Sequence, residues 1–326
     1  MMALIPQSIP SPDWSSFNLG PLTIHAYALC IMLGMVAAIM LTRKRWRDRG
    51  LDPDIVLDAA LLAIPMGIVG ARLYHVAITD PTYYFGSWEG LREIPMLWHG
   101  GLGIMGAVAF GALAVWIVCR RNSVSFATFA DCVAPSLLVA QAIGRWGNWF
   151  NQELFGGPTT LPWGLEISPQ SGNFPVGMPV DTLFHPTFLY ESLWNLLGAA
   201  VLIWLGRSAR TAGRVDGGRL FAVYLIWYGL GRMLIELFLR IDPSYTLMGV
   251  RIHVFTAAGL ILLGLVLFWI LSRRSRCRTD DGTAAASSSV DPTTAHDGTE
   301  AATLRADAVE EPTTAPDTDP ATDRTR

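Results

Sequence analysis

The sequence has few charged residues for its length. Of 326 residues, 16% are charged and 51% are hydrophobic, and the mean hydropathy is +0.36. Soluble domains carry roughly 25% charged residues, so this composition excludes an ordinary water-soluble globule. The net charge of −3 provides no basic surface that would neutralise phosphates, which excludes a nucleic-acid-binding protein.

Lysine, cysteine and histidine are also scarce. Lys44 is the only lysine, and the four cysteines show no paired spacing, which excludes a disulfide scaffold. The six histidines are scattered and form no H-E-x-x-H motif, so we expect no metal site. Residues 101–106 read G-x-G-x-x-G, but no strand precedes them. We therefore reject a dinucleotide site and expect these glycines to permit close helix packing.

Long apolar runs, in contrast, are abundant. A helix needs about 17–25 mostly apolar residues to cross a bilayer, and backbone groups in lipid must pair within the segment. Seven segments meet this requirement: Pro21–Leu41, Ile55–Ile78, His99–Cys119, Val124–Ile143, Thr187–Leu205, Leu220–Leu239 and Ile252–Leu271. The sequence thus predicts an all-α integral membrane protein, a bundle of seven transmembrane helices.

The arginines predict how this bundle is oriented. The connections after the first, third, fifth and seventh spans carry 15 basic residues, and the alternate connections carry 4. Because cytoplasmic loops are rich in Lys and Arg, we expect the N-terminus outside and the C-terminus in the cytoplasm. The irregular segments 79–98 and 145–185 then lie on the outer face. No basic residue precedes Arg43, so we expect no signal peptide.

Composition divides the chain after Arg278. Residues 1–278 carry 21 basic and 16 acidic residues, whereas residues 279–326 carry 3 arginines, 11 acidic residues and no aromatic residue. We expect residues 1–278 to form the seven-helix membrane domain that carries the active site. Residues 279–326 are too polar to bury a core, and we predict a disordered acidic cytoplasmic tail.

Polar residues cluster where the fourth span ends. A charged group in mid-membrane costs about 2.5–3.5 kcal/mol, so charged residues near the spans indicate a functional site. The cluster consists of Arg145, Asn148, Asn151, Glu153 and Gly156. A guanidinium group matches phosphate oxygens, amides add neutral donors, and glycine lets backbone N–H groups approach an anion. The alternative is a snorkelling arginine beside an ordinary polar loop.

The sixth span places Tyr228, Arg232 and Glu236 on one face, because they are four residues apart. Arg232 can therefore meet Arg145 near the same leaflet, unless it forms only an ion pair with Glu236. Arg72 ends the second span, and we expect either a third anion contact or a partner for an acidic residue, Glu191 or Asp131.

Four motifs together resemble the prolipoprotein diacylglyceryl transferases, a family of bacterial membrane enzymes. The first is G-R-W-G-N-W-F-N-Q-E-L-F-G at residues 144–156, and the second is H-P-T-F-L-Y-E at residues 185–191. The third joins Tyr228, Arg232 and Glu236, and the fourth is Gly20-Pro21 followed by Tyr27. The resemblance extends from Gly20 to about Leu271.

The resemblance implies transfer of an sn-1,2-diacylglyceryl group from phosphatidylglycerol to the thiol of the lipobox cysteine of a prolipoprotein. The substrate still carries its signal peptide, the products are a thioether-linked lipid and glycerol phosphate, and no metal or nucleotide cofactor takes part. The implied location is the bacterial cytoplasmic membrane, with several passes through the bilayer and the active site toward the outer leaflet. The implied partners are phosphatidylglycerol, the prolipoprotein signal peptide and the lipid bilayer.

The resemblance also suggests roles for individual residues. We expect Arg145 and Arg232 to bind the phosphate, Asn148 and Tyr27 to fix the glycerol, and Glu153 to orient Arg145. The further substrate contacts implied are Asn151, Gly156, His185, Tyr190, Glu191 and Tyr228.

The proton acceptor remains open in this sequence. Many family members carry a histidine in the third helix where this chain has Met105, and methionine cannot accept a proton. His99, His185 and Tyr27 are the alternatives. The competing interpretations of the whole protein are a transporter or lipid flippase with an arginine-lined headgroup site, and a non-catalytic membrane assembly protein.

Overall fold

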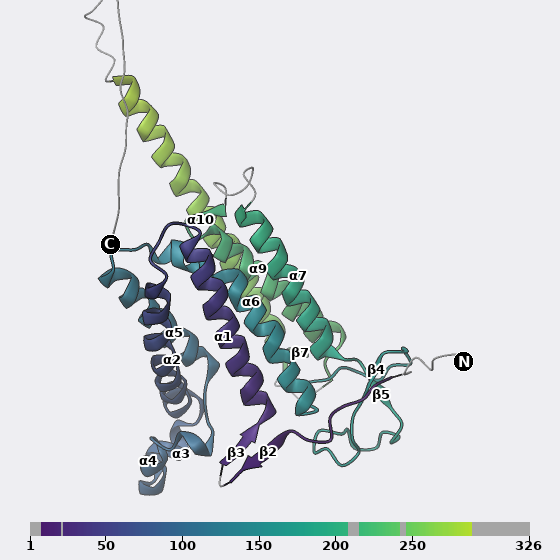
Figure 1. The fold of residues 1–326 in the computed structure, drawn as a ribbon. Helices are drawn as coiled ribbons and strands as arrows, with labels where there is room; N and C mark the ends of the chain where they lie inside the picture. Colours follow the sequence, from purple (N-terminus) through teal and green to yellow (C-terminus); the bar gives the residue numbers. More distant parts are fainter. Residues whose placement is uncertain (1–7, 21, 208–214, 242–245, 289–326) are drawn as a thin grey trace, which may run out of the picture. The chain divides into compact units, whose positions relative to one another are not determined.

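The computed structural model describes residues 8–20, 22–207, 215–241 and 246–288. The chain divides into two compact units, Met1–Arg278 and Thr279–Arg326, and the first contains the helical bundle of Figure 1. Within the described residues, seven helices are long and apolar enough to cross a membrane. They are α1 (Ala26–Arg47), α2 (Asp54–Tyr74) with its π-helical extension η1 (His75–Thr79), α5 (Ile104–Arg121), α6 (Phe126–Phe150), α7 (Thr187–Arg207), α9 (Arg219–Phe238) and α10 (Ile252–Ser288). The predicted all-α membrane fold with seven spans is confirmed.

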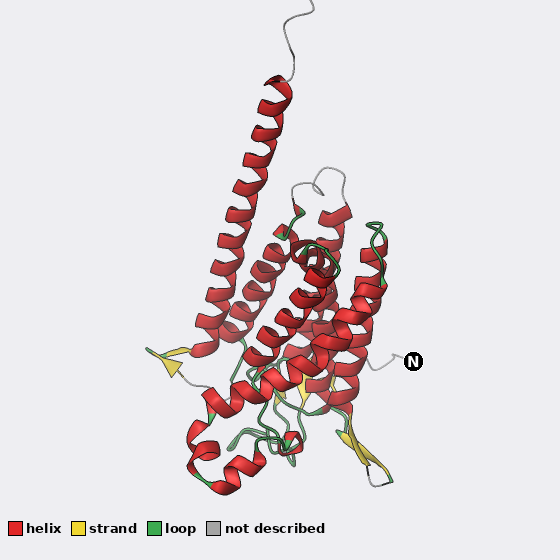
Figure 2. Ribbon diagram, turned by 90° about the vertical axis from the view of Figure 1, so that its left-hand side faces the viewer, coloured by secondary structure: helices red, strands yellow, loops and turns green. Residues whose placement is uncertain are grey.

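The short elements lie toward one end of this bundle, the lower end in Figure 2, which we call the site end. They are β1 (Ser8–Ile9), β2 (Ser16–Leu19), β3 (Leu22–His25), α3 (Pro81–Gly86), α4 (Trp88–Glu93), η2 (Leu97–His99), β4 (Gly164–Glu166), β5 (Leu183–Phe184), β6 (Thr246–Leu247) and β7 (Val250–Arg251). Strands β1, β4 and β5 form one small sheet, and β2–β3 and β6–β7 form hairpins. The first sheet fastens the N-terminal strand to the segment between α6 and α7.

Helix α6 occupies the middle of the bundle, where it packs on α1, α7 and α9, and α2 pairs with α5 beside it (Figure 1). Glycines allow the α2–α5 contact. A Cβ at Gly106 would lie 2.1 Å from the carbonyl oxygen of Gly70, so only glycine fits there. The expectation that the glycines of residues 101–106 permit close helix packing is confirmed at Gly106.

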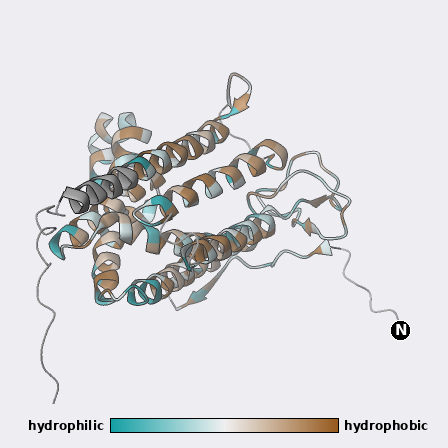
Figure 3. Ribbon diagram, turned by 90° about the horizontal axis from the view of Figure 1, so that it is seen from above, coloured by the Kyte–Doolittle hydropathy of each residue, from teal (hydrophilic) through white to brown (hydrophobic). Residues whose placement is uncertain are grey.

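The helices of the bundle are rich in apolar residues, drawn brown in Figure 3, and many of these side chains are exposed. Side chains such as Leu61, Met40 and Leu262 are 74%, 67% and 63% exposed. A monomeric soluble protein rarely exposes continuous apolar surface of this kind. Contact with lipid tails accounts for it.

Several helix boundaries differ from the sequence expectation, and three of the differences have a local reason. Helix α1 begins at Ala26 rather than at Pro21, because Gly20 adopts a φ of +62° in the turn of the β2–β3 hairpin. Helix α5 begins at Ile104 rather than at His99, because Gly100 and Gly101 have φ values of +84° and +73° and interrupt the helix. Helix α6 continues to Phe150, which places the first half of the predicted polar cluster on a helix.

The opposite end of the bundle carries the arginine-rich connections and contains a buried carboxylate. Asp131 on α6 is fully buried and accepts hydrogen bonds from the backbone N–H groups of Gly218, at 2.7 Å, and Phe221, at 2.9 Å. These donors belong to the first turn of α9, which has no side-chain cap of its own. Asp131 therefore caps α9 from a neighbouring helix.

Beyond the bundle, helix α10 runs through Ser288, so residues 279–288 of the predicted tail are helical. Residues 289–326 lie outside the described residues.

Candidate active site

Three arginines converge on one buried carboxylate at the site end. Glu191, near the N-terminus of α7, has a side chain that is 7% exposed. Its Oε2 atom lies 2.7 Å from Nη2 of Arg145 and 3.6 Å from Nη1 of Arg232. Its Oε1 atom lies 3.3 Å from Nη2 of Arg240. Arg145 and Arg232 therefore approach the same oxygen atom, as their helix faces predict.

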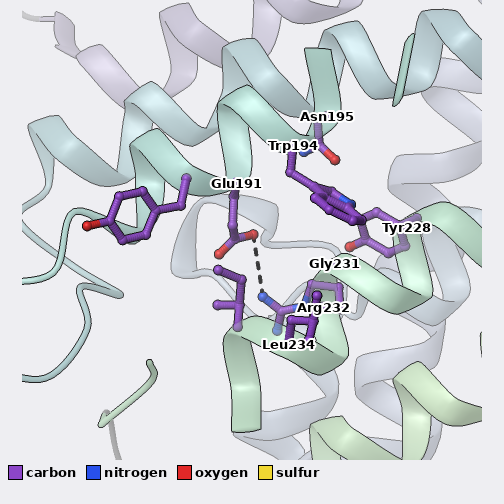
Figure 4. Close-up of a pocket in the computed structure, with 9 residues that line it drawn as sticks. Glu191, Trp194, Asn195, Tyr228, Gly231, Arg232 and Leu234 are labelled. Carbon is purple, nitrogen blue, oxygen red and sulfur yellow. Dashed lines mark ion pairs between the residues drawn. The ribbon is translucent and has the colours of Figure 1, made fainter. Parts of the chain in front are cut away.

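A second carboxylate, Glu236, extends the network along α9. It is fully buried, forms an i,i+4 ion pair with Arg232, and lies 3.0 Å from Nε of Arg251 through its Oε2 atom. The sequence left open that Arg232 forms only an ion pair with Glu236. That ion pair is formed, but Arg232 also faces Glu191 (Figure 4). The network joins four arginines to two glutamates, so it carries an excess of positive charge.

The end of α6 continues the network through amides. Nη1 of Arg145 donates to Oδ1 of Asn148 at 3.3 Å, and Nδ2 of Asn148 donates to Oε1 of Glu153 at 2.9 Å. Nδ2 of Asn151 donates to the same Glu153 oxygen at 3.2 Å. Glu153 therefore orients Arg145 indirectly, by fixing which atom Asn148 presents to the guanidinium group.

A strained turn aims Glu153 back at these amides. Gln152 and Leu154, on either side of it, have φ values of +50° and +58°, which residues other than glycine rarely adopt. The side chain of Gln152 supports the turn, because it donates to the carbonyl of Pro12 at 2.9 Å and accepts from the N–H of Ser168 at 2.8 Å.

Tyr27 joins this group from α1. A Cβ at Gly147 would lie 2.5 Å from Cδ2 of Tyr27, so the tyrosine ring rests directly on the glycine that precedes Asn148. The side chain of Tyr27 is 38% exposed. The motif glycine therefore makes room for the aromatic ring.

The second motif, residues 185–191, connects the loops of the site end to α7. Nδ1 of His185 lies 3.3 Å from the hydroxyl of Tyr190, which also accepts a hydrogen bond from Nε1 of Trp163 at 3.0 Å. Gly156 lies under His185, because a Cβ there would approach Cβ of His185 to 2.7 Å. Gly156 also bridges to Arg240, and this contact brings Arg240 to Glu191.

A cavity of about 130 Å³ opens between α7 and α9 beside the network (Figure 4). Its lining includes Tyr190, Glu191, Trp194, Tyr228 and Arg232. Tyr228 and Arg232 thus share one face, as their spacing predicts. The cavity is largely apolar, and the charged groups lie along one side of it.

Two tryptophans fix the distance between α7 and α9 next to the cavity. Nε1 of Trp194 donates to the carbonyl of Trp227 at 3.2 Å, and Nε1 of Trp227 donates to the carbonyl of Trp194 at 3.1 Å. The rings stack 4.6 Å apart. Gly198 and Gly231 leave space for them.

His99 and Arg72 lie elsewhere in the fold. Nδ1 of His99 lies 3.8 Å from Glu93, and no hydrogen bond or ion pair among the described residues joins His99 to Arg145 or Glu191. Arg72 was expected to contact an anion or to pair with Glu191 or Asp131, and among the described residues it pairs with neither carboxylate. Its guanidinium group instead donates to the backbone carbonyls of residues 93, 94, 100 and 101. These bonds clamp the segment that leads into α5.

Arg240 and Arg251 are the site residues that the sequence did not identify. In the sequence, both are isolated basic residues in the connection after the sixth span, which was predicted to lie outside. The bridge from Gly156 and the β6–β7 hairpin place them against Glu191 and Glu236, and no spacing rule reveals either contact. Within the part of the chain that the structure describes, no group of three or more histidine, cysteine or acidic side chains is arranged to hold a metal.

The fold and the site together define a multi-pass helical membrane protein with a buried arginine–glutamate network at one end. The family described as prolipoprotein diacylglyceryl transferase matches residues 15–270. A phosphatidylglycerol–prolipoprotein diacylglyceryl transferase of Bifidobacterium adolescentis is 47% identical over 276 residues, which cover 82% of this chain and 81% of the relative. A Streptomyces coelicolor protein with the same name and the suffix 2 is 47% identical over 265 residues, covering 81% and 80%. For a Cutibacterium acnes relative with that name, the identity is 47% over 267 residues, covering 82% and 88%. The chain belongs to the prolipoprotein diacylglyceryl transferase family, and the predicted membership is confirmed.

Proposed function

We propose that this chain transfers the sn-1,2-diacylglyceryl group of phosphatidylglycerol to a prolipoprotein cysteine. Its membership of a transferase family supports this function over transport or lipid flipping. The structural observation that carries the proposal is the approach of Arg145 and Arg232 to one oxygen of the buried Glu191 carboxylate.

The reaction forms one bond and breaks one. The lipobox sulfur attacks the glycerol carbon that bears the phosphate, a C–S bond forms, and the C–O bond to phosphate breaks. The electron pair of that bond leaves with glycerol phosphate. The proton lost by the thiol balances the negative charge that the phosphate gains.

The arginines bind the group on which this charge develops. A diester phosphate carries one negative charge, and the monoester that leaves approaches two at neutral pH. The network holds four arginines and two glutamates, with side chains that are at most 18% exposed. Fixed cations in such a water-poor site stabilise the departing phosphate more than water would.

Asn148 and Tyr27 complete the headgroup site. Asn148 is already oriented by Glu153, so its amide faces Arg145 without reorganisation. Tyr27 rests on the same helical turn, and we expect it to fix the glycerol together with Asn148. Asn151 and Gly156 support the turn, Tyr190 and Tyr228 line the cavity, and His185 contacts Tyr190.

We place the lipobox thiol next to Tyr27. A thiol has a pKa near 8.5, so a positive field that favours the thiolate helps the attack. Of His99, His185 and Tyr27, the tyrosine rests on Gly147 in the helical turn of Arg145 and Asn148, whereas His185 faces Tyr190 and His99 faces Glu93. Met105 is 61% exposed and its side chain carries no basic group.

We further propose that the site end faces the outside of a bacterial cytoplasmic membrane. The opposite end carries the arginine-rich connections, which favour the cytoplasm. The cavity between α7 and α9 then gives phosphatidylglycerol a lateral path from the outer leaflet to Arg232.

A transfer assay in detergent tests this function. The purified protein is incubated with phosphatidylglycerol labelled in its acyl chains and with a peptide that contains a lipobox cysteine. We expect a labelled thioether and free glycerol phosphate in equal amounts, and no product with a Cys→Ser peptide. Movement of labelled lipid across vesicles without any covalent product would contradict the proposal and favour a transporter.

A further inference from the structure

The Glu191 carboxylate occupies the donors that a phosphate would use. Its two oxygens face three guanidinium groups, at 2.7 Å from Arg145, 3.3 Å from Arg240 and 3.6 Å from Arg232. Carboxylate and phosphate are both anions that arginine binds through parallel N–H groups. Glu191 therefore makes the contacts expected of a bound headgroup.

The Glu191 carboxylate satisfies these arginine donors incompletely. Nη1 of Arg232 is buried and has no hydrogen-bond partner among the described residues, because 3.6 Å to Glu191 is too long for one. A buried donor without an acceptor is unfavourable. A phosphate monoester has three terminal oxygens, one more than a carboxylate, and can serve all three guanidinium groups at once.

Glu191 is also the acidic residue that lies between the cavity and these arginine donors. It lines the cavity together with Arg232 and Tyr228 (Figure 4), whereas Glu236 is fully buried, pairs with Arg232 and is not among the lining residues. A headgroup that enters between α7 and α9 meets the Glu191 carboxylate first. Removing an anion from this cluster without replacing it would leave buried cations unpaired.

We propose that Glu191 is an exchangeable counter-anion. Its carboxylate holds Arg145, Arg232 and Arg240 in the free enzyme, gives up these donors to the lipid phosphate, and takes them back when glycerol phosphate leaves. This inference rests on the proposed function. It makes Glu191 a product-release residue, because without its return a doubly charged phosphate would stay bound to the arginines.

Glu191→Gln removes the negative charge of the side chain and keeps its shape. Two measurements on this variant test the proposal. The inhibition constant of glycerol phosphate should fall by about tenfold or more, since the phosphate no longer competes with a carboxylate. Turnover should change to a rapid first transfer followed by a slow steady rate. Glu191→Asp keeps the anion and should show no such burst. A Glu191→Gln protein with a raised inhibition constant and a slow first transfer would overturn the proposal.

Glu236→Gln is the charge-matched control, because it removes a carboxylate from the same network without emptying the place at the cavity. We expect a much smaller fall in the inhibition constant than with Glu191→Gln. An equal fall would show that net charge alone governs phosphate affinity, and would overturn the exchange.

Thermal unfolding with glycerol phosphate gives a readout that does not require activity. The Tm of Glu191→Gln should rise more with glycerol phosphate than that of the wild type, and an equal or smaller rise would overturn the inference. If the wild type forms no thioether, the proposed function fails, while this binding measurement still tests the counter-anion.

Discussion

Arg145 links two parts of the site through different nitrogen atoms. Nη2 contacts Glu191 on α7, and Nη1 donates to Asn148 one turn further along α6. A planar guanidinium group can hold both contacts at fixed positions, whereas an ammonium group is a point charge on a flexible chain. The residue type at this position is therefore as important as its charge.

Arg145→Lys should lose most of the transferase activity. Lysine keeps the charge but cannot hold Glu191 and Asn148 together, so the site would no longer be preorganised. We expect kcat/KM to fall by about 10²-fold or more, the effect of removing one oriented donor from a charge-stabilising site. Steady-state transfer of labelled lipid measures it. Arg121→Lys, at an exposed position at the opposite end of the bundle, is the control, and wild-type turnover in Arg145→Lys would contradict the proposed phosphate site.

Sequence spacing identified the site residues that lie close together in the chain. Arg145, Asn148 and Glu153 fall within nine positions, and Tyr228, Arg232 and Glu236 follow the helical repeat, so local geometry brings each group together. The position of Arg240 could not be predicted in this way, because it follows from the bridge to Gly156, which depends on the path of a loop. The partners of Arg72 could not be predicted because they are backbone carbonyls, and every residue has a carbonyl.

At the scale of the helices, apolar length predicted the spans but not where they begin and end. Backbone conformation decided the starts of α1 and α5, at Gly20 and at Gly100 and Gly101. Helix α6 extends past the apolar run because its polar residues, such as Asn148, find partners in the site. Hydropathy cannot detect such partners.

Gly147→Ala should weaken the contact between α1 and α6. The new methyl group would lie 2.5 Å from the Tyr27 ring, so the ring or the helix must move. Overpacking of this kind costs typically about 1–3 kcal/mol, and it displaces Tyr27 from Asn148. Thermal unfolding in detergent and the transfer assay measure the two effects. Gly259→Ala, which meets nothing within 4 Å, should leave both unchanged, and the same result for Gly147→Ala would refute this packing argument.

Asp131→Ala should destabilise the start of α9. The substitution leaves the buried N–H groups of Gly218 and Phe221 without an acceptor, at a cost of about 2–3 kcal/mol. Asp131→Asn keeps one good acceptor and should fall in between. Asp216→Ala removes a carboxylate that is 54% exposed and pairs with Arg49, so its Tm should change little. Equal Tm values for Asp131→Ala and Asp216→Ala would exclude the cap.

For the molecule as a whole, the charge bias predicts one orientation. The arginine-rich connections lie at the end where Asp131 caps α9, and the arginine–glutamate network lies at the other. Because arginine-rich connections favour the cytoplasm, we expect the thiol to reach the network from the outer side.

Single cysteines introduced into a cysteine-free variant test this orientation. Val176 is fully exposed in the loops of the site end, and Asn122 is exposed in the connection between α5 and α6. We expect Val176→Cys to react with a membrane-impermeant maleimide in intact cells. Asn122→Cys should react only after permeabilisation. The reverse pattern would place the site end in the cytoplasm.

The reciprocal hydrogen bonds of Trp194 and Trp227 have a genetic consequence. Each indole donates to the main chain of the other residue, so losing either ring removes one hydrogen bond between the two helices and unstacks the remaining ring. Replacing both by phenylalanine should thus cost clearly less than the sum of the two single replacements. In a mutational screen the two positions would show strong epistasis and tolerate change chiefly as a pair.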